Sequence, residues 1–586
     1  MKKFYTLIVV TLLISHYALA QWPANYGGVM LQGFYWNSFE ETKWTNLTSQ
    51  VDELSTYFDA IWVPNSAWCT DGQSMGYDPV YWFRHKSTFG QPRELTEMTK
   101  AFKAKNVSII EDVVLNHKKP LGNKVTKDGK TVNSWIDFAE ETVKFGGETY
   151  NITWSGADIC KNDDGGYTAS QGWEVTGNND TGDDFSGFRD LDHTSANVQK
   201  NVIIYLRYLM EVLGYDGFRL DMVKGYSGNY TKMYNEAVKP KFCVGEYWDG
   251  FDKITNWINS TGKTSAAFDF PLKYQLNEAC QGNWGALSNK GMAGSPDWSR
   301  YAVTFVDNHD TYENESRLVG SVLAANAIIL AMPGTPCIFL KHWQSYPIAI
   351  GNMILARKAC GITNQSSITK QYQSGNGYVI EVQGSKGSVL CLCGTPSFDT
   401  NGWKCIAAGE NFAYYVSNNI NVSGLRPGTD NPYKGEVPEC VKPIEGHIYF
   451  YFQSNKDFPT PYAWVWGQDE VNFNSNKTWP GDAMKKVGQD SDQHDIYLWD
   501  GGVAGNNMPT GIVVSNNGDK QTADFVFYNG GYYDASGYLT TASSISNVTI
   551  DKNIGNSKAT YTLTGQRAAE GYRGIVIKNG KKFIWK

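Results

Sequence analysis

Short apolar runs rich in β-branched residues alternate with longer helical stretches between residue 29 and about residue 343. This alternation is typical of repeated strand–helix units that build a parallel sheet. Eight strands are predicted, each bounded by polar or turn residues: Val29–Tyr35, Ala60–Pro64, Ser108–Leu115, Gly217–Met222, Phe242–Tyr247, Ala267–Phe270, Val303–Val306 and Cys337–Leu340. Eight such units predict an α/β fold of the TIM-barrel type, (β/α)8.

One long segment interrupts this rhythm after the third strand. Residues 117–185 are rich in Gly, Asn, Asp and Thr, where a strand–helix unit should continue with a helix. Long irregular segments inside a compact domain are usually functional insertions. We therefore predict an inserted domain over 117–185, and a barrel formed by residues 21–116 and 186–350.

The composition changes again beyond the barrel, to short alternating strands separated by Gly and Ser turns. This pattern predicts all-β C-terminal domains, the first a β-sandwich over residues 355–437. A second β-rich, aromatic domain is predicted over 445–536, after a Pro-containing linker. A short tail follows over 545–586.

Two apolar stretches bear on localisation. Residues 1–20 contain a lysine pair, an apolar run and a small-residue Ala-Leu-Ala end, which is the pattern of a secretory signal peptide. The longer apolar run Leu318–Leu340 is interrupted by Asn326 and a Pro-Gly-Thr-Pro turn, so it predicts a buried helix and strand. A secreted protein without a transmembrane segment is expected.

Charge and cysteine content exclude some partners. A net charge of −7 and the absence of any Lys or Arg run argue against nucleic-acid binding. The 10 cysteines include no Cys-x-x-Cys pair, so a zinc site is unsupported and disulfide pairing stays open. Aromatic residues make up 14% of the chain, which suits both sugar stacking and a β-rich core.

Reactive side chains gather at four predicted strand ends, where TIM barrels place their active sites. These are Asn116 and His117 after the third strand, Arg219 and Asp221 in the fourth, Glu246 after the fifth, and His309 and Asp310 after the seventh. Each alone is more often a cap or an ion-pair partner, but all of them together indicate chemistry. Glycosidic cleavage with retention needs two carboxyl groups about 5–5.5 Å apart, which adjacent strands can supply.

These strings resemble the α-amylase family, glycoside hydrolase family 13, over about residues 26–435. The motifs are Gly-Phe-Arg-x-Asp at 217–221, Gly-Glu-x-Trp at 245–248 and Asn-His-Asp at 308–310. The resemblance implies a retaining endo-hydrolase of α-1,4-glucosidic bonds in starch and glycogen. It also implies the roles of Asp221 as nucleophile, Glu246 as general acid/base and Asp310 as stabiliser of the transition state.

The same resemblance implies further site residues. Tyr77 would stack on the sugar at the cleavage point, and His117 and His309 would bind its hydroxyls. Arg219 would hold Asp221 ionised, and Lys224 would contact substrate beyond the cleavage point.

Calcium is the cofactor that the resemblance implies. Its ligands would be Asn116, Asp190, the carbonyl of Gly225, and Asp184 with Asp180 as the alternative. Hard oxygen ligands are those that Ca²⁺ prefers.

The C-terminal segment resembles a family 26 starch-binding module, with Tyr462, Trp464 and Trp479 as candidate glucan-stacking rings. The tail resembles short β-rich C-terminal tails of secreted bacterial proteins, some of which are sorting signals. The protein is therefore expected to be either released or attached at the cell surface. A monomer is expected, because monomers are usual in the family that the chain resembles.

The sequence departs from the family pattern in two places. The segment after Tyr77 reads Asp-Pro-Val-Tyr-Trp-Phe-Arg from Asp78 to Arg84, without the acidic continuation that is usual in the family. The eighth strand ends with Lys341-His342-Trp343, where an acidic residue is common. Three alternatives stay open: another family 13 activity such as a maltogenic enzyme or a glucanotransferase, a starch-capturing protein on an inactive barrel, and a structural adhesin.

Overall fold

The computed structural model describes residues 21–541, together with three short strands of the tail. The gaps within this range are residues 290, 428–429, 431–436, 445, 468–470, 491–492, 506–507 and 536. The predicted signal peptide and most of the predicted tail lie outside the described residues. The chain forms two compact units, Met1–Asp430 and Asn431–Lys586, which are described separately.

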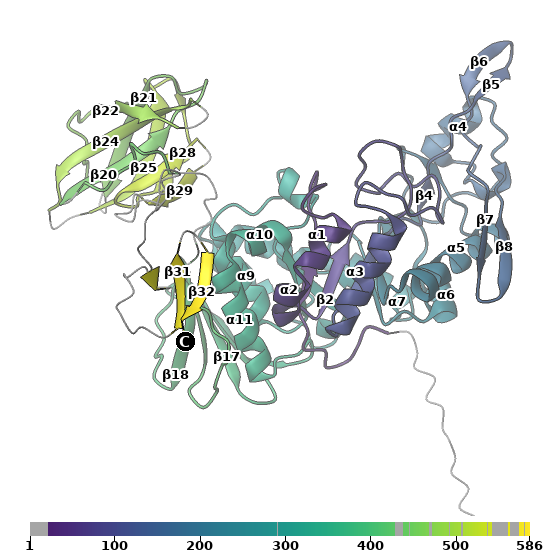
Figure 1. Cartoon of the computed structure of the whole chain (residues 1–586), viewed down its shortest axis with the longest axis horizontal. Coiled ribbons are helices and arrows are strands. Elements are labelled where there is room, and N and C mark those ends of the chain that lie inside the picture. Colours follow the sequence, from purple (N-terminus) through teal and green to yellow (C-terminus); the bar gives the residue numbers. More distant parts are fainter. Residues whose placement is uncertain are drawn as a thin grey trace, which may run out of the picture. The chain divides into compact units, whose positions relative to one another are not determined.

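A closed barrel of eight parallel strands forms the centre of the first unit (Figure 1). The strands are β1 (Met30–Gln32), β2 (Ala60–Val63), β3 (Ser108–Val113), β10 (Gly217–Leu220), β11 (Phe242–Gly245), β12 (Ala266–Phe268), β13 (Ala302–Phe305) and β14 (Thr335–Phe339). Every residue of these strands is buried, because the barrel interior lies on one face and the helices on the other. The predicted TIM-barrel fold is confirmed.

Helices follow the strands and cover the barrel. They are α1 (Trp44–Ser49), α2 (Val51–Tyr57), α3 (Pro92–Ala104), α5 (Ala196–Tyr208), α6 (Gly228–Val238), α7 (Phe251–Ser260), α8 (Phe270–Cys280), α9 (Val322–Ala331), α10 (Leu340–Ser345) and α11 (Pro347–Cys360). Helix α3 begins with Pro92 and a capping box between Gln91 and Glu94, which satisfies its first backbone N–H groups. Helix α9 is apolar around its circumference and buried, as predicted for the run Leu318–Leu340. None of the described helices is long and apolar enough to cross a membrane.

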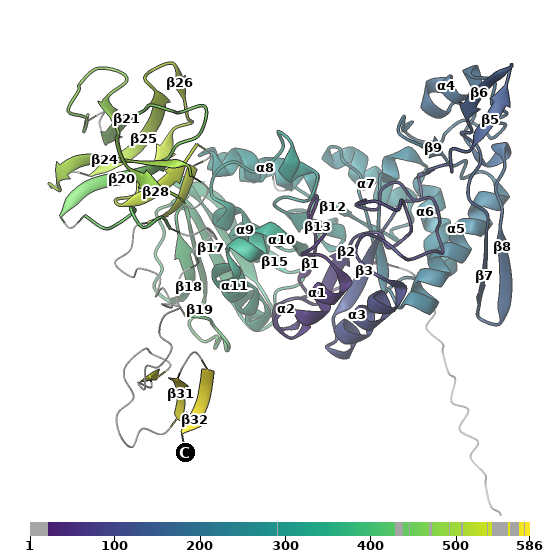
Figure 2. The same cartoon turned by 45° about the horizontal axis from the view of Figure 1, so that its top comes forward.

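The segment between β3 and α5 is irregular and contains three small antiparallel pairs. β4 (His117–Lys118) pairs with β9 (Arg189–Asp190), β5 (Lys124–Lys127) with β6 (Lys130–Asn133), and β7 (Glu141–Phe145) with β8 (Glu148–Ile152); α4 (Tyr167–Ser170) lies between β8 and β9. Figure 2 shows the β7–β8 hairpin beside α5, where Phe145 and Ile152 pack on Ile204. The pairing of β4 with β9 brings both ends of the segment back to the barrel rim.

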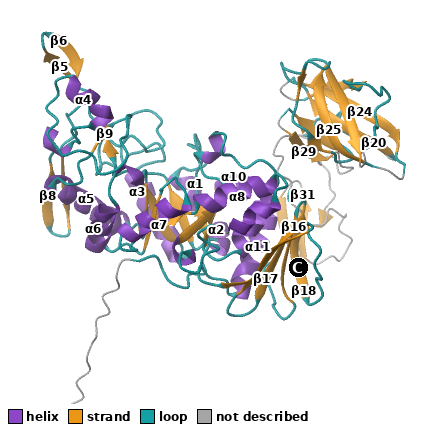
Figure 3. Ribbon diagram, turned by 180° about the vertical axis from the view of Figure 1, so that it is seen from behind, coloured by secondary structure: helices purple, strands orange, loops and turns teal. Residues whose placement is uncertain are grey.

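A five-stranded antiparallel sheet follows α11 in the first unit. Its strands are β15 (Ser367–Ser374), β16 (Asn376–Gln383), β17 (Ser388–Thr395), β18 (Trp403–Gly409) and β19 (Phe412–Ser417). The predicted sandwich would have two facing sheets, whereas the described residues here form one. Its inner face, including Ile380 and Tyr414, shares a core with the barrel helices, and α11 lies against it (Figure 3). Helices therefore bury the face that a second sheet would cover.

The second unit contains two sheets of five strands each, in the orders β23-β24-β20-β28-β29 and β22-β21-β25-β26, with β27 also on β25. The strands are β20 (His447–Gln453), β21 (Pro461–Gly467), β22 (Asp482–Ala483), β23 (Lys485–Gln489), β24 (Asp495–Val503), β25 (Pro509–Asn516), β26 (Lys520–Gln521), β27 (Phe525–Val526), β28 (Gly531–Asp534) and β29 (Gly537–Thr541). Phe450 and Trp499 from the first sheet and Val465 and Ile512 from the second share one core. The tail contributes a separate sheet of β30 (Tyr561–Thr562), β31 (Gly574–Lys578) and β32 (Lys581–Trp585).

All ten cysteines lie among the described residues, and all are free thiols. Eight are buried, Cys405 is exposed and Cys440 is partly exposed. Within each unit, packing rather than disulfide bonding therefore stabilises the described residues.

Candidate active site

Six of the predicted catalytic and substrate-binding residues line one cavity at the carboxyl ends of the barrel strands. Asp221 follows β10 directly, and Glu246 follows β11 directly. The cavity measures about 420 Å³ and is lined by Trp36, Ser74, Met75, Tyr77, Asp78, His117, Phe185, Phe188, Asp221, Met222, Glu246, His309 and Asp310. Trp36 follows the first barrel strand and Asp310 follows the seventh, so the closed barrel is what brings them together.

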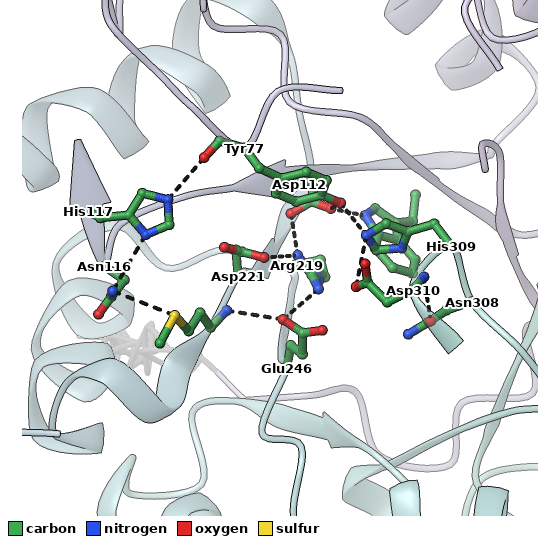
Figure 4. Close-up of polar contacts among 12 residues, drawn as sticks. Tyr77, Asp112, Asn116, His117, Arg219, Asp221, Glu246, Asn308, His309 and Asp310 are labelled. Atoms are coloured by element: carbon green, nitrogen blue, oxygen red, sulfur yellow. Dashed lines mark hydrogen bonds and ion pairs between the residues drawn. The ribbon is translucent and has the colours of Figure 1, made fainter. Parts of the chain in front are cut away.

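Arg219 forms ion pairs with three carboxyl groups at this site (Figure 4). Its Nη1 lies 2.7 Å from Asp112 Oδ1 and 2.7 Å from Asp221 Oδ1, and its Nη2 lies 2.8 Å from Glu246 Oε2. Burial alone would lower the pKa of Arg219, but these three carboxylates raise it well above its usual range. One permanent positive charge therefore orients both carboxyl groups at the ends of β10 and β11.

Glu246 is set up to hold a proton at neutral pH. Burial is the main cause that raises its pKa, Arg219 opposes the shift, and the negative charges of Asp221 and Asp310 add to it, so that the pKa lies at about 8. Its Oε2 also accepts the backbone N–H of Met222 at 3.2 Å. Met222 has the left-handed conformation φ 43, ψ 51, which is unusual for a residue with a side chain. The turn after Asp221 thus fixes the carboxyl group of Glu246.

Asp310 is held on the opposite side of the cavity by neighbouring loops. Trp36 Nε1 donates to its Oδ1 at 3.1 Å, and His309 Nε2 lies 3.2 Å from its Oδ2. The backbone N–H groups of Asp310 and Thr311 donate to Asn308 Oδ1 at 3.0 and 2.8 Å. This turn directs the Asp310 carboxylate into the cavity that Asp221 and Glu246 line (Figure 4).

Tyr77 and His309 form the floor between the carboxyl groups. Their rings stack with centroids 5.3 Å apart and an interplanar angle of 6°. The Tyr77 hydroxyl donates to Asp112 Oδ2 at 2.8 Å and lies 2.6 Å from His309 Nε2. Burial lowers the pKa of His309 to about 4, so this histidine is neutral at pH 7. Both residues line the cavity, and Tyr77 is the more exposed of the two, so its ring is the one that could serve as a sugar-binding platform.

The other two predicted substrate contacts differ in position. His117 lines the cavity, with its Nε2 2.9 Å from the Tyr77 carbonyl and its ring stacked on Phe185 at 4.3 Å. Lys224 does not line this cavity; its Nζ lies 3.3 Å from Asp183 and 3.3 Å from Asp249. A contact between Lys224 and a longer substrate would require it to share these partners.

An acidic cluster lies beside the active site, in the segment between β3 and α5. Carboxylate oxygens of Asp163, Asp184 and Asp190 lie within 4.8 Å of one another. Burial and the neighbouring charges of Asp180 and Asp163 raise the pKa of Asp190 to about 9. Asp163 also pairs with the Arg189 guanidinium. Asp163 and Asp190 are buried and Asp184 is exposed, and the excess negative charge of such an oxygen-rich site is what a divalent cation would neutralise.

Asn116 joins this cluster to the barrel. Its Nδ2 donates to Asp190 Oδ1 at 2.9 Å, and its Oδ1 lies against Gly225, where an added Cβ would meet it at 1.8 Å. Only glycine at position 225 lets the Asn116 side chain approach so closely. The donor set of three carboxylates and an amide fits a hard cation. Of the residues expected to bind calcium, Asn116, Asp184 and Asp190 belong to this set.

Several residues of the site were not predicted. Asp112, Trp36 and Phe188 line or support the cavity, and Asp163 belongs to the acidic cluster. Asp112 could have been predicted from the sequence, because a buried arginine needs counter-charges and Asp112 lies in register beside Arg219 in the adjacent strand. The other three come from loops whose spatial neighbours are distant in sequence.

The departure at the end of the eighth strand has a structural explanation. His342 Nε2 lies 3.6 Å from Asp307 Oδ2, and the Lys273 Nζ lies 2.8 Å from Asp307 Oδ1. Lys341 lies over the rings of Tyr35 and Tyr312 at 4.6 and 4.3 Å. A lysine therefore already satisfies Asp307, and an acidic residue at position 342 would add a second negative charge to a buried site.

In the second unit, the candidate glucan-stacking residues share one surface. Tyr462 and Trp464 lie on the same, partly exposed face of β21, and Trp479 is 42% exposed. The rings of Trp464 and Trp479 are 6.2 Å apart at an angle of 61°.

A (β/α)8 barrel with two carboxyl groups on one arginine at adjacent strand ends is the architecture of a glycoside hydrolase. The family model for the alpha amylase catalytic domain matches residues 43–342. "Probable alpha-amylase 2" of Arabidopsis thaliana is 30% identical over 421 residues, covering 66% of this chain and 93% of that protein. The chain therefore belongs to the alpha-amylase family.

Two bacterial proteins are also similar. "Glucan 1,4-alpha-maltotetraohydrolase" of Stutzerimonas stutzeri is 28% identical over 402 residues, covering 62% of this chain and 67% of that protein. "Alpha-amylase" of Bacillus licheniformis is 26% identical over 363 residues, covering 54% of this chain and 70% of that protein.

Proposed function

We propose that this glycoside hydrolase is an endo-acting α-amylase that cleaves α-1,4-glucosidic bonds in starch, glycogen and related α-glucans with retention. The observation that carries the proposal is the pair of carboxyl groups on Arg219: Asp221 at 2.7 Å from Nη1, and Glu246 at 2.8 Å from Nη2 with its pKa raised to about 8. A retaining hydrolase needs one ionised carboxylate and one protonated carboxyl group on the same bond.

In the first step, Glu246 gives its proton to the glycosidic oxygen while an Asp221 oxygen bonds to the anomeric carbon, and the C–O bond to the leaving sugar breaks. Glu246 is then a carboxylate. In the second step it takes a proton from water, the water oxygen bonds to the anomeric carbon, and the bond to Asp221 breaks. Both residues return to their starting protonation states.

The remaining residues bind and orient the sugar. Asp310 faces the developing positive charge on the ring and hydrogen-bonds its hydroxyls. Tyr77 stacks on the sugar face, His117 and neutral His309 hydrogen-bond hydroxyl groups, and Lys224 contacts longer substrates. Their positions on one cavity, apart from Lys224, support these roles.

A calcium ion is proposed at the acidic cluster, held by Asn116, Asp184, Asp190 and the carbonyl of Gly225. Asp163, from the same cluster, would add a further carboxylate. The ion would supply charge that the buried carboxylates need, and it would tie the inserted segment to the barrel. Its proposed part in the reaction is structural.

The second unit is proposed to bind starch through Tyr462, Trp464 and Trp479, and the protein is proposed to be a secreted monomer. The adjacent rings of Trp464, which is partly exposed, and Trp479, which is exposed, support glucan binding, because indole faces stack on sugars. Such a module would hold the catalytic unit close to an insoluble substrate.

The test is the reducing-sugar release and product profile on soluble starch for the parent protein and its Glu246→Gln variant. Oligosaccharides of mixed length from the parent, and none from the variant, would support an endo-acting α-amylase. A single short product would favour an activity like that named for the Stutzerimonas stutzeri relative. No release from either protein would favour a starch-capturing function.

A further inference from the structure

A second cavity, also of about 420 Å³, lies in the segment between β3 and α5. Its wall contains the aromatic rings of Trp135 and Phe188 and the polar side chains of Asn133, Arg189 and Lys119. No role described above uses Trp135 or Asn133.

The second cavity adjoins the active-site cavity at two places. Phe188 lines both cavities. Asp78 lines the active-site cavity and Lys119 lines the second one, and Lys119 Nζ lies 2.7 Å from Asp78 Oδ2. Lys119 also lies over the Phe188 ring at 5.6 Å. A linear ligand that extends past Phe188 and this ion pair would pass from one cavity into the other.

The lining of the second cavity suits a carbohydrate. Aromatic rings provide flat apolar surfaces for sugar C–H faces, and amide, ammonium and guanidinium groups donate to hydroxyls. The Trp135 ring has the Arg189 guanidinium over it at 5.0 Å and Tyr167, which is 47% exposed, at 5.3 Å. Its position is therefore fixed before any ligand binds.

The backbone around Trp135 is also held in place. The N–H of Ser134 donates to the Asn123 carbonyl at 2.6 Å. The Asp137 carboxylate accepts the N–H groups of Gly122 and Asn123 at 3.3 and 3.0 Å. A preformed wall costs little ordering on binding, which favours a genuine subsite.

We propose that this second cavity is a distal glucan subsite, in which Trp135 and Asn133 bind glucose units of the substrate remote from the cleaved bond. The inference rests on the proposed function and adds a determinant of chain-length preference to it. Substrates that are too short to pass Phe188 do not reach the subsite. Longer chains gain binding energy there, which raises kcat/KM and biases the length of the products.

The test compares kcat/KM on maltotriose, maltoheptaose and soluble amylose for the parent, Trp135→Ala and Asn133→Ala. Trp173→Ala is the matched control, because Trp173 lies in the same segment and lines neither cavity. We expect Trp135→Ala to lose about tenfold on amylose, the size of one stacking contact, and to change less than about twofold on maltotriose. Asn133→Ala should show the same length dependence with a smaller loss.

Equal losses on all three substrates, or no loss on amylose in either variant, would overturn the proposal. Because Trp135 packs on Arg189, Trp135→Phe is also measured, and it should retain most of the parent's activity on amylose. If Trp135→Phe loses as much activity as Trp135→Ala and Asn133→Ala loses none, the result counts against the subsite. A parent protein that cleaves none of the three substrates would instead refute the proposed function. The two failures are therefore distinguishable.

Discussion

Hydrolysis should fall about tenfold for each pH unit above pH 8, because the general acid is lost there. The pKa of Glu246 is raised to about 8, first by burial and then by the charges of Asp221 and Asp310. A raised pKa keeps the carboxyl group protonated at all lower pH values, so activity is retained on the acid side of 8 and declines on the alkaline side. With its ordinary value of about 4.5, only roughly one molecule in 300 would carry the proton at pH 7.

The assay is kcat/KM on maltoheptaose between pH 5 and 10, with enzyme preincubated at each pH and then returned to pH 7 as a stability control. Asp310→Asn removes one of the charges that raise the pKa of Glu246, so the alkaline limb of its residual activity should move to lower pH. An alkaline limb centred near pH 5, or one that Asp310→Asn moves upward, would refute the reasoning.

Three further predictions concern stability and binding. Lys273 Nζ lies 2.8 Å from Asp307 Oδ1, and the two side chains are 0% and 1% exposed. Lys273→Met leaves the Asp307 carboxylate buried without this cation, so it should lower the free energy of unfolding by about 3 kcal/mol in urea titrations. Lys232→Met, which removes a pair that is about half exposed, is the control and should change it by less than about 0.5 kcal/mol. A calcium chelator should lower the unfolding temperature of the parent but have less effect on Asp190→Asn; equal effects would argue against the proposed ligand. Trp479→Ala should weaken binding to starch granules while leaving hydrolysis of soluble starch unchanged, and an equal loss on both would count against a binding module.

The barrel was predictable from sequence because each strand is a short, fully buried apolar run. The ends of the strands were not, and several were predicted too long. The first was predicted as Val29–Tyr35, whereas β1 spans Met30–Gln32. Residues beyond the last ladder bond, such as Leu115 after β3, are still buried at the top of the barrel. Hydrophobicity therefore does not mark where the sheet ends and the active-site loops begin.

The site itself was partly predictable for the same reason. Carboxylates at strand ends must meet once the barrel closes, so Asp221 and Glu246 were placed together by topology alone. Asp163 was not predicted, because it lies 27 positions before Asp190 in an irregular segment. Strand alternation also does not reveal whether helices or a second sheet cover a face, which is why the sheet after α11 was expected to be a sandwich.

The free cysteines provide an internal probe of the motions of this protein. Nine of the ten thiols belong to Met1–Asp430 and only Cys440 to the second unit. A thiol reagent should therefore modify Cys405 first and reach the eight buried groups only through transient opening. Mass spectrometry of each labelled peptide would convert those rates into local opening free energies around the barrel, without any engineered label.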